Sequence, residues 1–128
     1  MVTAVVARKP EDCHRLISIA MTAGDLEGVL ALYEPQAQLV PDPGAQPVSG
    51  EALKEAHRAF ISLKPTLEVR TENVIQSGDI AVLRSNWTIV GEQPDGTPVT
   101  LANRGIEVVR RQPDGSWKYV IDNPFGDE

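Results

Sequence analysis

Residues 102–123 read ANRGIEVVRRQPDGSWKYVIDN, and this stretch decides the fold because two β-rich runs flank a tight turn. The turn is Pro113-Asp114-Gly115-Ser116. Proline presets φ, aspartate bonds its own backbone, and glycine accepts a positive φ. The sequence therefore predicts a β-hairpin here.

The register of this hairpin brings two acidic residues together. A four-residue loop places Gln112 opposite Trp117, and antiparallel pairing then sets Glu107 opposite Asp122, with Cβ atoms about 5 Å apart. Like charges at this separation disfavour each other, so at least one of the two pKa values should be raised. A solvated pair at a strand end stays open as the alternative, since a slip of one residue swaps the faces. The same register pairs Val109 with Val120 and puts Ile106, Val108, Trp117 and Ile121 on the other face.

Helical periodicity predicts three helices before the hairpin. The first covers about residues 10–22, the second begins at the cap Asp25, includes Tyr33 in its apolar stripe and ends at Pro35, and the third covers about residues 50–62. A short strand is expected at 37–40. Four β-rich runs follow at about 66–76, 79–91, 97–112 and 116–124.

This order of elements predicts an α+β fold, with N-terminal helices packed on an antiparallel sheet. The 128 residues suit a single domain over 1–128 with a substantial core. The word QPDG occurs at 93–96 and again at 112–115, which indicates one hairpin chemistry used twice.

Composition excludes several classes of function. A net charge of −6 and the lack of a basic stripe argue against nucleic-acid binding. No stretch approaches the roughly 20 apolar residues of a membrane span, so no membrane partner is expected. The single cysteine, Cys13, permits no internal disulfide, and the start of the chain lacks a secretory pattern. We expect a cytoplasmic protein.

Motifs for metals and cofactors are also missing from the sequence. His14 and His57 are the only histidines and fall on separate predicted helices, without HxxxH or CxxC spacing, so no metal site is expected. There is no glycine-rich phosphate loop and no serine in a nucleophile elbow, so we expect no cofactor and no nucleophilic catalysis.

The motifs AGDLEG at 23–28, LALY at 30–33, Pro43-Gly44 and Ser49-Gly50 resemble the ketosteroid isomerase and SnoaL-like families of the nuclear transport factor 2-like superfamily. The resemblance implies a cone-shaped α+β (cystatin-like) fold, in which a curved sheet wraps a long helix and leaves a pocket at its open end. It also implies a homodimer that meets through the sheet.

The resemblance implies where the catalytic positions of these two families fall in this sequence, and only some of those positions keep the same type of residue. The ketosteroid isomerase's loop aspartate falls on Pro41, its oxyanion-donor tyrosine on Ile17, and its second carboxylate on Glu107. The last-strand aspartate of SnoaL-like cyclases falls on Asp122, and the histidine that precedes it by two falls on Val120.

From these positions we expect Asp122 to be a catalytic base with Glu107 as its protonated partner. Five more residues are candidate ligand-binding groups, and each has a structural alternative. These are Trp87 (a pocket wall or a core residue), His57 (an acid/base group or a core histidine), Tyr33 (a donor or a core tyrosine), Arg104 (an anion contact or a surface arginine) and Asn123 (a carbonyl contact or a strand-ending turn).

Three functions remain open from the sequence. The first is a cofactor-independent isomerase, cyclase or lyase acting on a small, largely apolar carbonyl or hydroxylated compound. The second is a non-catalytic binding module for a small apolar molecule, and the third is a dimeric association domain with a vestigial pocket. Apolar residues occur at both parities of the predicted strands, so both sheet faces should be covered, one of them by a second copy of the chain.

Overall fold

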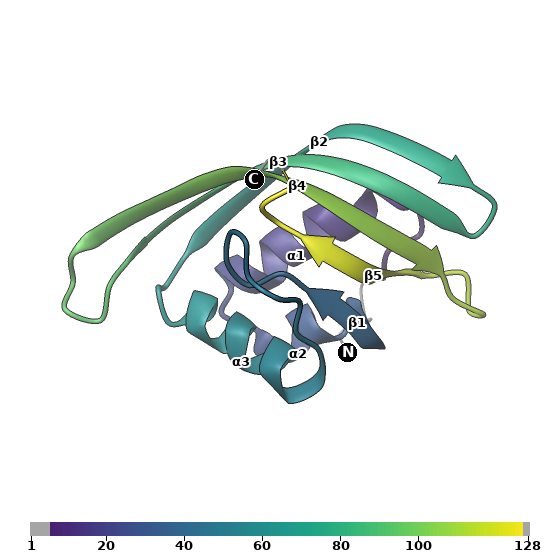
Figure 1. Cartoon of the computed structure of the whole chain (residues 1–128). Helices are drawn as coiled ribbons and strands as arrows, with labels where there is room; N and C mark the ends of the chain where they lie inside the picture. Colours follow the sequence, from purple (N-terminus) through teal and green to yellow (C-terminus); the bar gives the residue numbers. More distant parts are fainter. Residues whose placement is uncertain (1–5, 127–128) are drawn as a thin grey trace, which may run out of the picture.

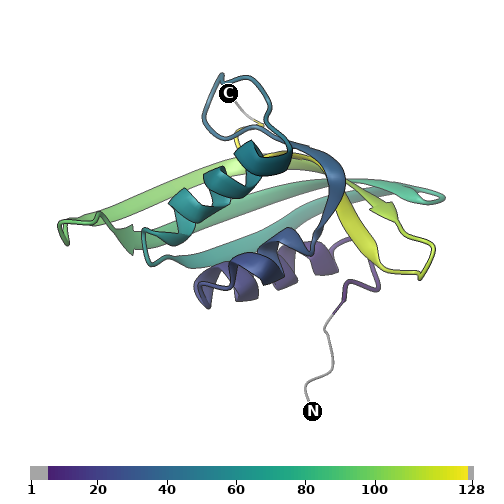
Figure 2. The same cartoon turned by 90° about the horizontal axis from the view of Figure 1, so that it is seen from below.

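The computed structural model describes residues 6–126, in which helices and one curved sheet form the expected α+β arrangement. The three helices lie on one face of the sheet and leave the other face uncovered in the described part of the chain (Figures 1 and 2). The helices are α1 (Asp12–Thr22), α2 (Leu26–Leu30) and α3 (Gly50–Ile61). The strands are β1 (Tyr33–Leu39), β2 (Thr66–Ser77), β3 (Ile80–Glu92), β4 (Pro98–Arg111) and β5 (Trp117–Asn123).

The sheet has the strand order β1-β5-β4-β3-β2. Strands β2 to β5 form the predicted antiparallel meander, and β1 adds to its edge in parallel to β5. Because β1 enters beside the last strand, the segment that follows α2 is brought next to the end of the chain.

Strand β1 begins earlier than expected, and the assignment of Tyr33 to the second helix is wrong. Helix α2 ends at Leu30, and the Tyr119 N–H donates to the carbonyl of Leu32 at 2.8 Å. Tyr33 then pairs with Tyr119, and the two rings pack with centroids 5.0 Å apart. Burial against the last strand overrides the helical spacing, as tertiary context often does.

The two QPDG turns adopt the same hydrogen-bond pattern. Gln93 N–H donates to the carbonyl of Thr97, and Gln112 N–H donates to the carbonyl of Ser116. In each turn the aspartate accepts a bond from the backbone N–H two residues later, and the glycine has a positive φ, 89° in the first and 86° in the second. The prediction of one turn chemistry used twice is confirmed.

The hairpin register is correct at the acidic pair and wrong near the turn. Glu107 pairs with Asp122 as predicted, but Val109 pairs with Tyr119 instead of Val120. The turn is one residue shorter than assumed, because the Gln112 N–H donates to the carbonyl of Ser116 and only residues 113–115 lie between them. A β-bulge at Val120 takes up the extra residue on β5. Consequently Trp117 lies on the inner face, where it is buried, and not on the outer face as expected.

The core lies between the helices and the inner face of the sheet. Its members recur at helical spacing on α1 and at alternate positions on β3. The outer face carries the residues of opposite parity. It includes an apolar row with one residue from each of β2 to β5, in which each residue pairs with the next across the sheet. This outer row consists of Ile75, Val82, Val108 and Ile121.

Candidate functional site

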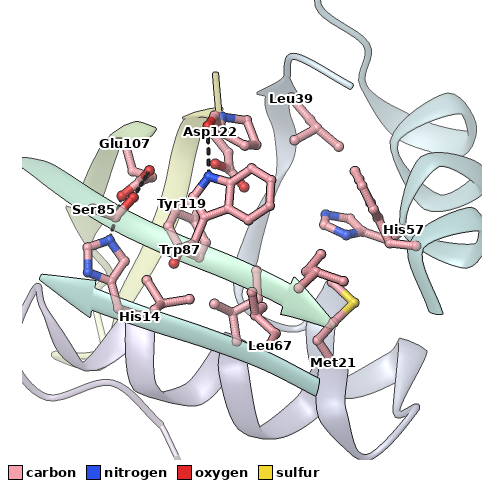
Figure 3. A pocket seen from close by; sticks show the side chains of 15 residues that line it. His14, Met21, Leu39, His57, Leu67, Ser85, Trp87, Glu107, Tyr119 and Asp122 are labelled. Atoms are coloured by element: carbon pink, nitrogen blue, oxygen red, sulfur yellow. Dashed lines mark hydrogen bonds and ion pairs between the residues drawn. The ribbon is translucent and has the colours of Figure 1, made fainter. Parts of the chain in front are cut away.

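A pocket of about 70 Å³ opens between the inner face of the sheet and helices α1 and α3 (Figure 3). Its walls are mainly apolar, and the polar residues among its lining are two histidines, two carboxylic acids, a serine and Tyr119. Glu107, Ser85 and His14 gather at one end, while His57 projects from α3 at the other (Figure 3). Asp122 lies between these ends.

The sheet register places the two carboxylates on this pocket. Glu107 on β4 is directly opposite Asp122 on β5, and both lie on the inner face. Their exposed fractions are 4% and 7%, so water screens neither charge effectively. The pair is therefore buried and not solvated at a strand end.

Asp122 is the carboxyl group whose protonation is most strongly perturbed. Burial, and after it the charge of Glu107, raise its pKa from the ordinary 3.8 to about 7, while a hydrogen bond from the Tyr33 hydroxyl opposes the shift. A carboxylate that titrates near neutral pH can both accept and return a proton, which is what acid/base catalysis needs.

Glu107 is held on both carboxylate oxygens. His14 Nε2 lies 2.5 Å from Oε1, and the Ser85 hydroxyl donates to Oε2 at 2.9 Å. The other ring nitrogen of His14 lies 2.6 Å from the hydroxyl oxygen of Thr71, which fixes the ring between α1 and β2. Gly105 makes room for this arrangement, since a Cβ there would lie 2.3 Å from Glu107 Oε2.

A second polar chain starts from Asp122. Tyr33 donates its hydroxyl proton to Asp122 Oδ2, and His57 Nε2 lies 2.9 Å from the Tyr33 hydroxyl oxygen. Burial lowers the pKa of His57 to about 4, so its imidazole is neutral at physiological pH. Burial and the nearby Asp122 raise the pKa of Tyr33 well above 10.0, so Tyr33 stays a neutral donor.

The structure also places the remaining predicted site residues. Trp87 lines the pocket, and its indole N–H donates to the carbonyl of Pro124 at 2.7 Å. Arg104 is exposed on the outer parity of β4, with Nε 3.6 Å from a carboxylate oxygen of Glu72. Asn123 follows Asp122 and accepts a bond from the backbone N–H of Phe125, so neither it nor Arg104 lines the pocket.

Sequence reasoning missed His14 and Ser85 as site residues. His14 has the helical spacing of the pocket residues Ile17 and Met21, and Ser85 shares its strand parity with Trp87. These spacings signal the buried face but not the contact with Glu107. Within residues 6–126, no group of three or more histidine, cysteine or acidic side chains is arranged to hold a metal ion. No helix in that range is long and apolar enough to cross a membrane.

Comparison with known families agrees with this architecture. A family model for the SnoaL-like domain matches residues 14–120. The chain belongs to the SnoaL-like domain family. The match runs from His14 on α1 to Val120 on β5, so it spans most of the elements that build the pocket of this SnoaL-like domain.

Solved structures share the fold at low sequence identity. An NTF-2-like protein of unknown function from Shewanella oneidensis MR-1 has a TM-score of 0.71 and 15% identity, covering 88% of this chain and 93% of its own. A ketosteroid isomerase-like protein from Erwinia carotovora atroseptica has a TM-score of 0.70 and 21% identity, covering 89% of this chain and 90% of its own. A protein proposed to be a calcium/calmodulin-dependent protein kinase type II association domain, from Thiobacillus denitrificans, has a TM-score of 0.73 and 20% identity, covering 95% and 99%.

These likenesses show that the SnoaL-like domain has the nuclear transport factor 2-like fold. No curated protein sequence matches the chain. Since the structural neighbours bear different descriptions and one is of unknown function, the reaction has to be argued from the pocket itself.

Proposed function

We propose that this SnoaL-like domain is a cofactor-independent acid/base enzyme, an isomerase, cyclase or lyase acting on a small, largely apolar carbonyl or hydroxylated compound. The observation that carries the proposal is Asp122, a buried carboxyl group with a pKa of about 7 that borders an apolar pocket. A base with this pKa combines a useful ionised fraction at neutral pH with enough basicity to remove a proton.

Asp122 has the role of general base. Its Oδ2 is held by Tyr33, while Oδ1 has no hydrogen-bond partner among the described residues and is free to meet a substrate. The base takes a proton from the carbon next to a substrate carbonyl, the electron pair of the broken C–H bond moves into an enolate, and protonated Asp122 returns the proton at another atom. Neutralising Asp122 relieves its repulsion with Glu107, which favours the transfer.

Glu107 has the role of a fixed charge beside the base. From the sequence we expected Glu107 to be the protonated member of the pair. The contacts of Glu107 instead favour Asp122 as the member that is protonated more readily. The Ser85 hydroxyl donates to Glu107, and His14 contacts its second oxygen, which suits an accepting carboxylate. Trp87 closes the wall of the pocket and keeps water from the pair.

Hydrogen exchange on a probe tests the base directly. With 4-hydroxycyclohexanone in D₂O, the wild-type protein should speed deuterium entry at the carbons next to the carbonyl, with a rate that rises through about pH 7. Asp122→Asn should lose this acceleration. Carbon-detected NMR of the side-chain carboxyls should show Asp122 titrating near 7. Equal exchange rates in wild type and Asp122→Asn would refute catalysis by this residue.

The second candidate function is a non-catalytic ligand-binding or dimeric association domain with a vestigial pocket. The outer row of apolar residues favours association, because Ile75 and Ile121 are 66% and 45% exposed on a sheet face that no described helix covers. We propose a homodimer through this face. A dimer without any exchange activity or probe binding would favour the association function over the enzyme.

The cellular location belongs to the same proposal. Cys13 is a free, fully buried thiol, and burial raises its pKa to about 12. A lone unreactive thiol agrees with a cytoplasmic protein, in which disulfides are rare.

A further inference from the structure

His57 uses only one of its two ring nitrogens. Nε2 lies 2.9 Å from the Tyr33 hydroxyl oxygen, whereas Nδ1 is buried without a hydrogen-bond partner among the described residues. The side chain is 3% exposed, and its ring points from α3 into the pocket (Figure 3). Buried polar atoms almost always have a partner in native proteins, so a lone one at a pocket indicates a place that a ligand completes.

The Tyr33 hydroxyl determines which nitrogen of His57 carries the proton. When Asp122 is ionised, Tyr33 donates its one hydroxyl proton to Asp122 Oδ2, so the Tyr33 oxygen can only accept from His57. Nε2 therefore bears the N–H. Because His57 is neutral, Nδ1 has a free lone pair and acts as an acceptor.

We propose that His57 Nδ1 is a specificity subsite that accepts a hydrogen bond from a hydroxyl group of an otherwise apolar ligand. This inference rests on the proposed function only in using the same pocket, and it adds that the ligand carries a hydroxyl group, which in a substrate stands apart from the reacting carbonyl. A carbonyl oxygen at this position would face the lone pair of Nδ1 and leave both groups unpaired. The hydroxyl group of the ligand is bound near α3, and its reacting carbon faces Asp122.

The neighbourhood of His57 supports an apolar ligand body. The ring of Phe60 lies with its centroid 6.2 Å from that of His57, and both residues line the pocket. Met21 and Leu39 complete the wall on this side (Figure 3). The apolar surroundings leave the imidazole and the hydroxyl group of a ligand as natural partners.

Nitrogen NMR of the ligand-free protein tests the tautomer. At pH 8.5, above the pKa of about 7 of Asp122, long-range ¹H–¹⁵N spectra should show His57 with a protonated Nε2 and an unprotonated Nδ1. The His57→Phe variant identifies the signals by their loss. A protonated Nδ1 in the wild-type protein would overturn the proposal.

Two probes of equal size then test the subsite. Cyclohexanol should shift the Nδ1 resonance toward its protonated position and bind about three- to tenfold more tightly than cyclohexanone, as expected for one hydrogen bond. In His57→Phe the two affinities should agree within about twofold. Tyr33→Phe keeps the imidazole but releases its tautomer, so it should reduce the preference as well. Equal affinities in the wild-type protein, or an alcohol preference unchanged in His57→Phe, would overturn the proposal.

These readouts separate the subsite from the enzyme. If hydrogen exchange fails but Nδ1 still recognises cyclohexanol, the pocket binds hydroxylated ligands without catalysis. If exchange succeeds and Nδ1 ignores cyclohexanol, the enzyme stands and the subsite does not exist.

Discussion

Asp122 makes the folded state sensitive to pH. Its pKa is about 7 in the folded chain, against an ordinary value of 3.8, because of burial and the charge of Glu107. Between these two values the folded state binds more protons than the unfolded state. The free energy of unfolding should therefore fall as the pH rises from about 4 to about 7, and then level off.

Asp122→Asn should remove this penalty while keeping the side-chain volume. We expect the free energy of unfolding to rise by about 3–4 kcal/mol at pH 8.5 and to change by less than about 1 kcal/mol at pH 4. Urea unfolding at the two pH values measures it. Asp42→Asn changes an exposed loop aspartate and serves as the control. It should change the free energy of unfolding by the same amount at both pH values. An equal effect of Asp122→Asn at both pH values would mean that its pKa is not raised.

Gly105 matters for the space that it leaves free. A Cβ at this position would lie 2.3 Å from Glu107 Oε2 and 2.7 Å from the Ser85 hydroxyl oxygen. Gly105→Ala should break the Ser85–Glu107 hydrogen bond and lower the free energy of unfolding by about 1–3 kcal/mol. Thermal unfolding measures the loss, with the exposed β4 substitution Thr100→Ala as the control. A fully stable Gly105→Ala variant would show that Glu107 moves without cost.

The link between helix α1 and strand β4 depends on His14. This residue joins Thr71 on β2 to Glu107 on β4, and it is 3% exposed. His14→Leu leaves the buried Glu107 with Ser85 as its remaining partner, so we expect a loss of about 3–5 kcal/mol in the free energy of unfolding. The neighbouring Arg15→Ala is the matched control, because Arg15 is 58% exposed and its ion pair with Asp12 is 3.8 Å long. Urea unfolding that gave the same small effect for both variants would contradict the role of His14.

At the scale of elements, local chemistry predicted more than long-range pairing did. The strands from β2 to β5 lie within a residue or two of their expected limits, since proline, glycine and aspartate mark each turn. Tyr33 was misplaced because its burial against Tyr119 depends on a parallel pairing that no local spacing indicates. The bulge at Val120 was missed for the same reason, although it restores the predicted pairing of Glu107 with Asp122.

The uncovered sheet face defines the behaviour of the whole molecule. We expect a homodimer of about 28 kDa, twice the subunit mass of 13.9 kDa, joined through the outer row. Ile121→Glu places a charge in this row and should give a monomer by sedimentation at micromolar concentration. Ile19→Glu changes an apolar residue of α1 that is 57% exposed on the opposite layer, and it should leave the dimer intact. A monomeric wild-type protein, or dimers of Ile121→Glu, would exclude this interface.

The sequence by itself determined the α+β class, the two matching hairpin turns and the facing carboxylates, because turn residues and strand periodicity act over a few neighbouring positions. Only the tertiary structure decided what surrounds those carboxylates. Tyr33 reaches Asp122 across 89 positions, and His14 reaches Glu107 across 93. Such contacts form because helices and sheet bury their apolar faces against each other, and that packing sets which polar side chains share a pocket without water.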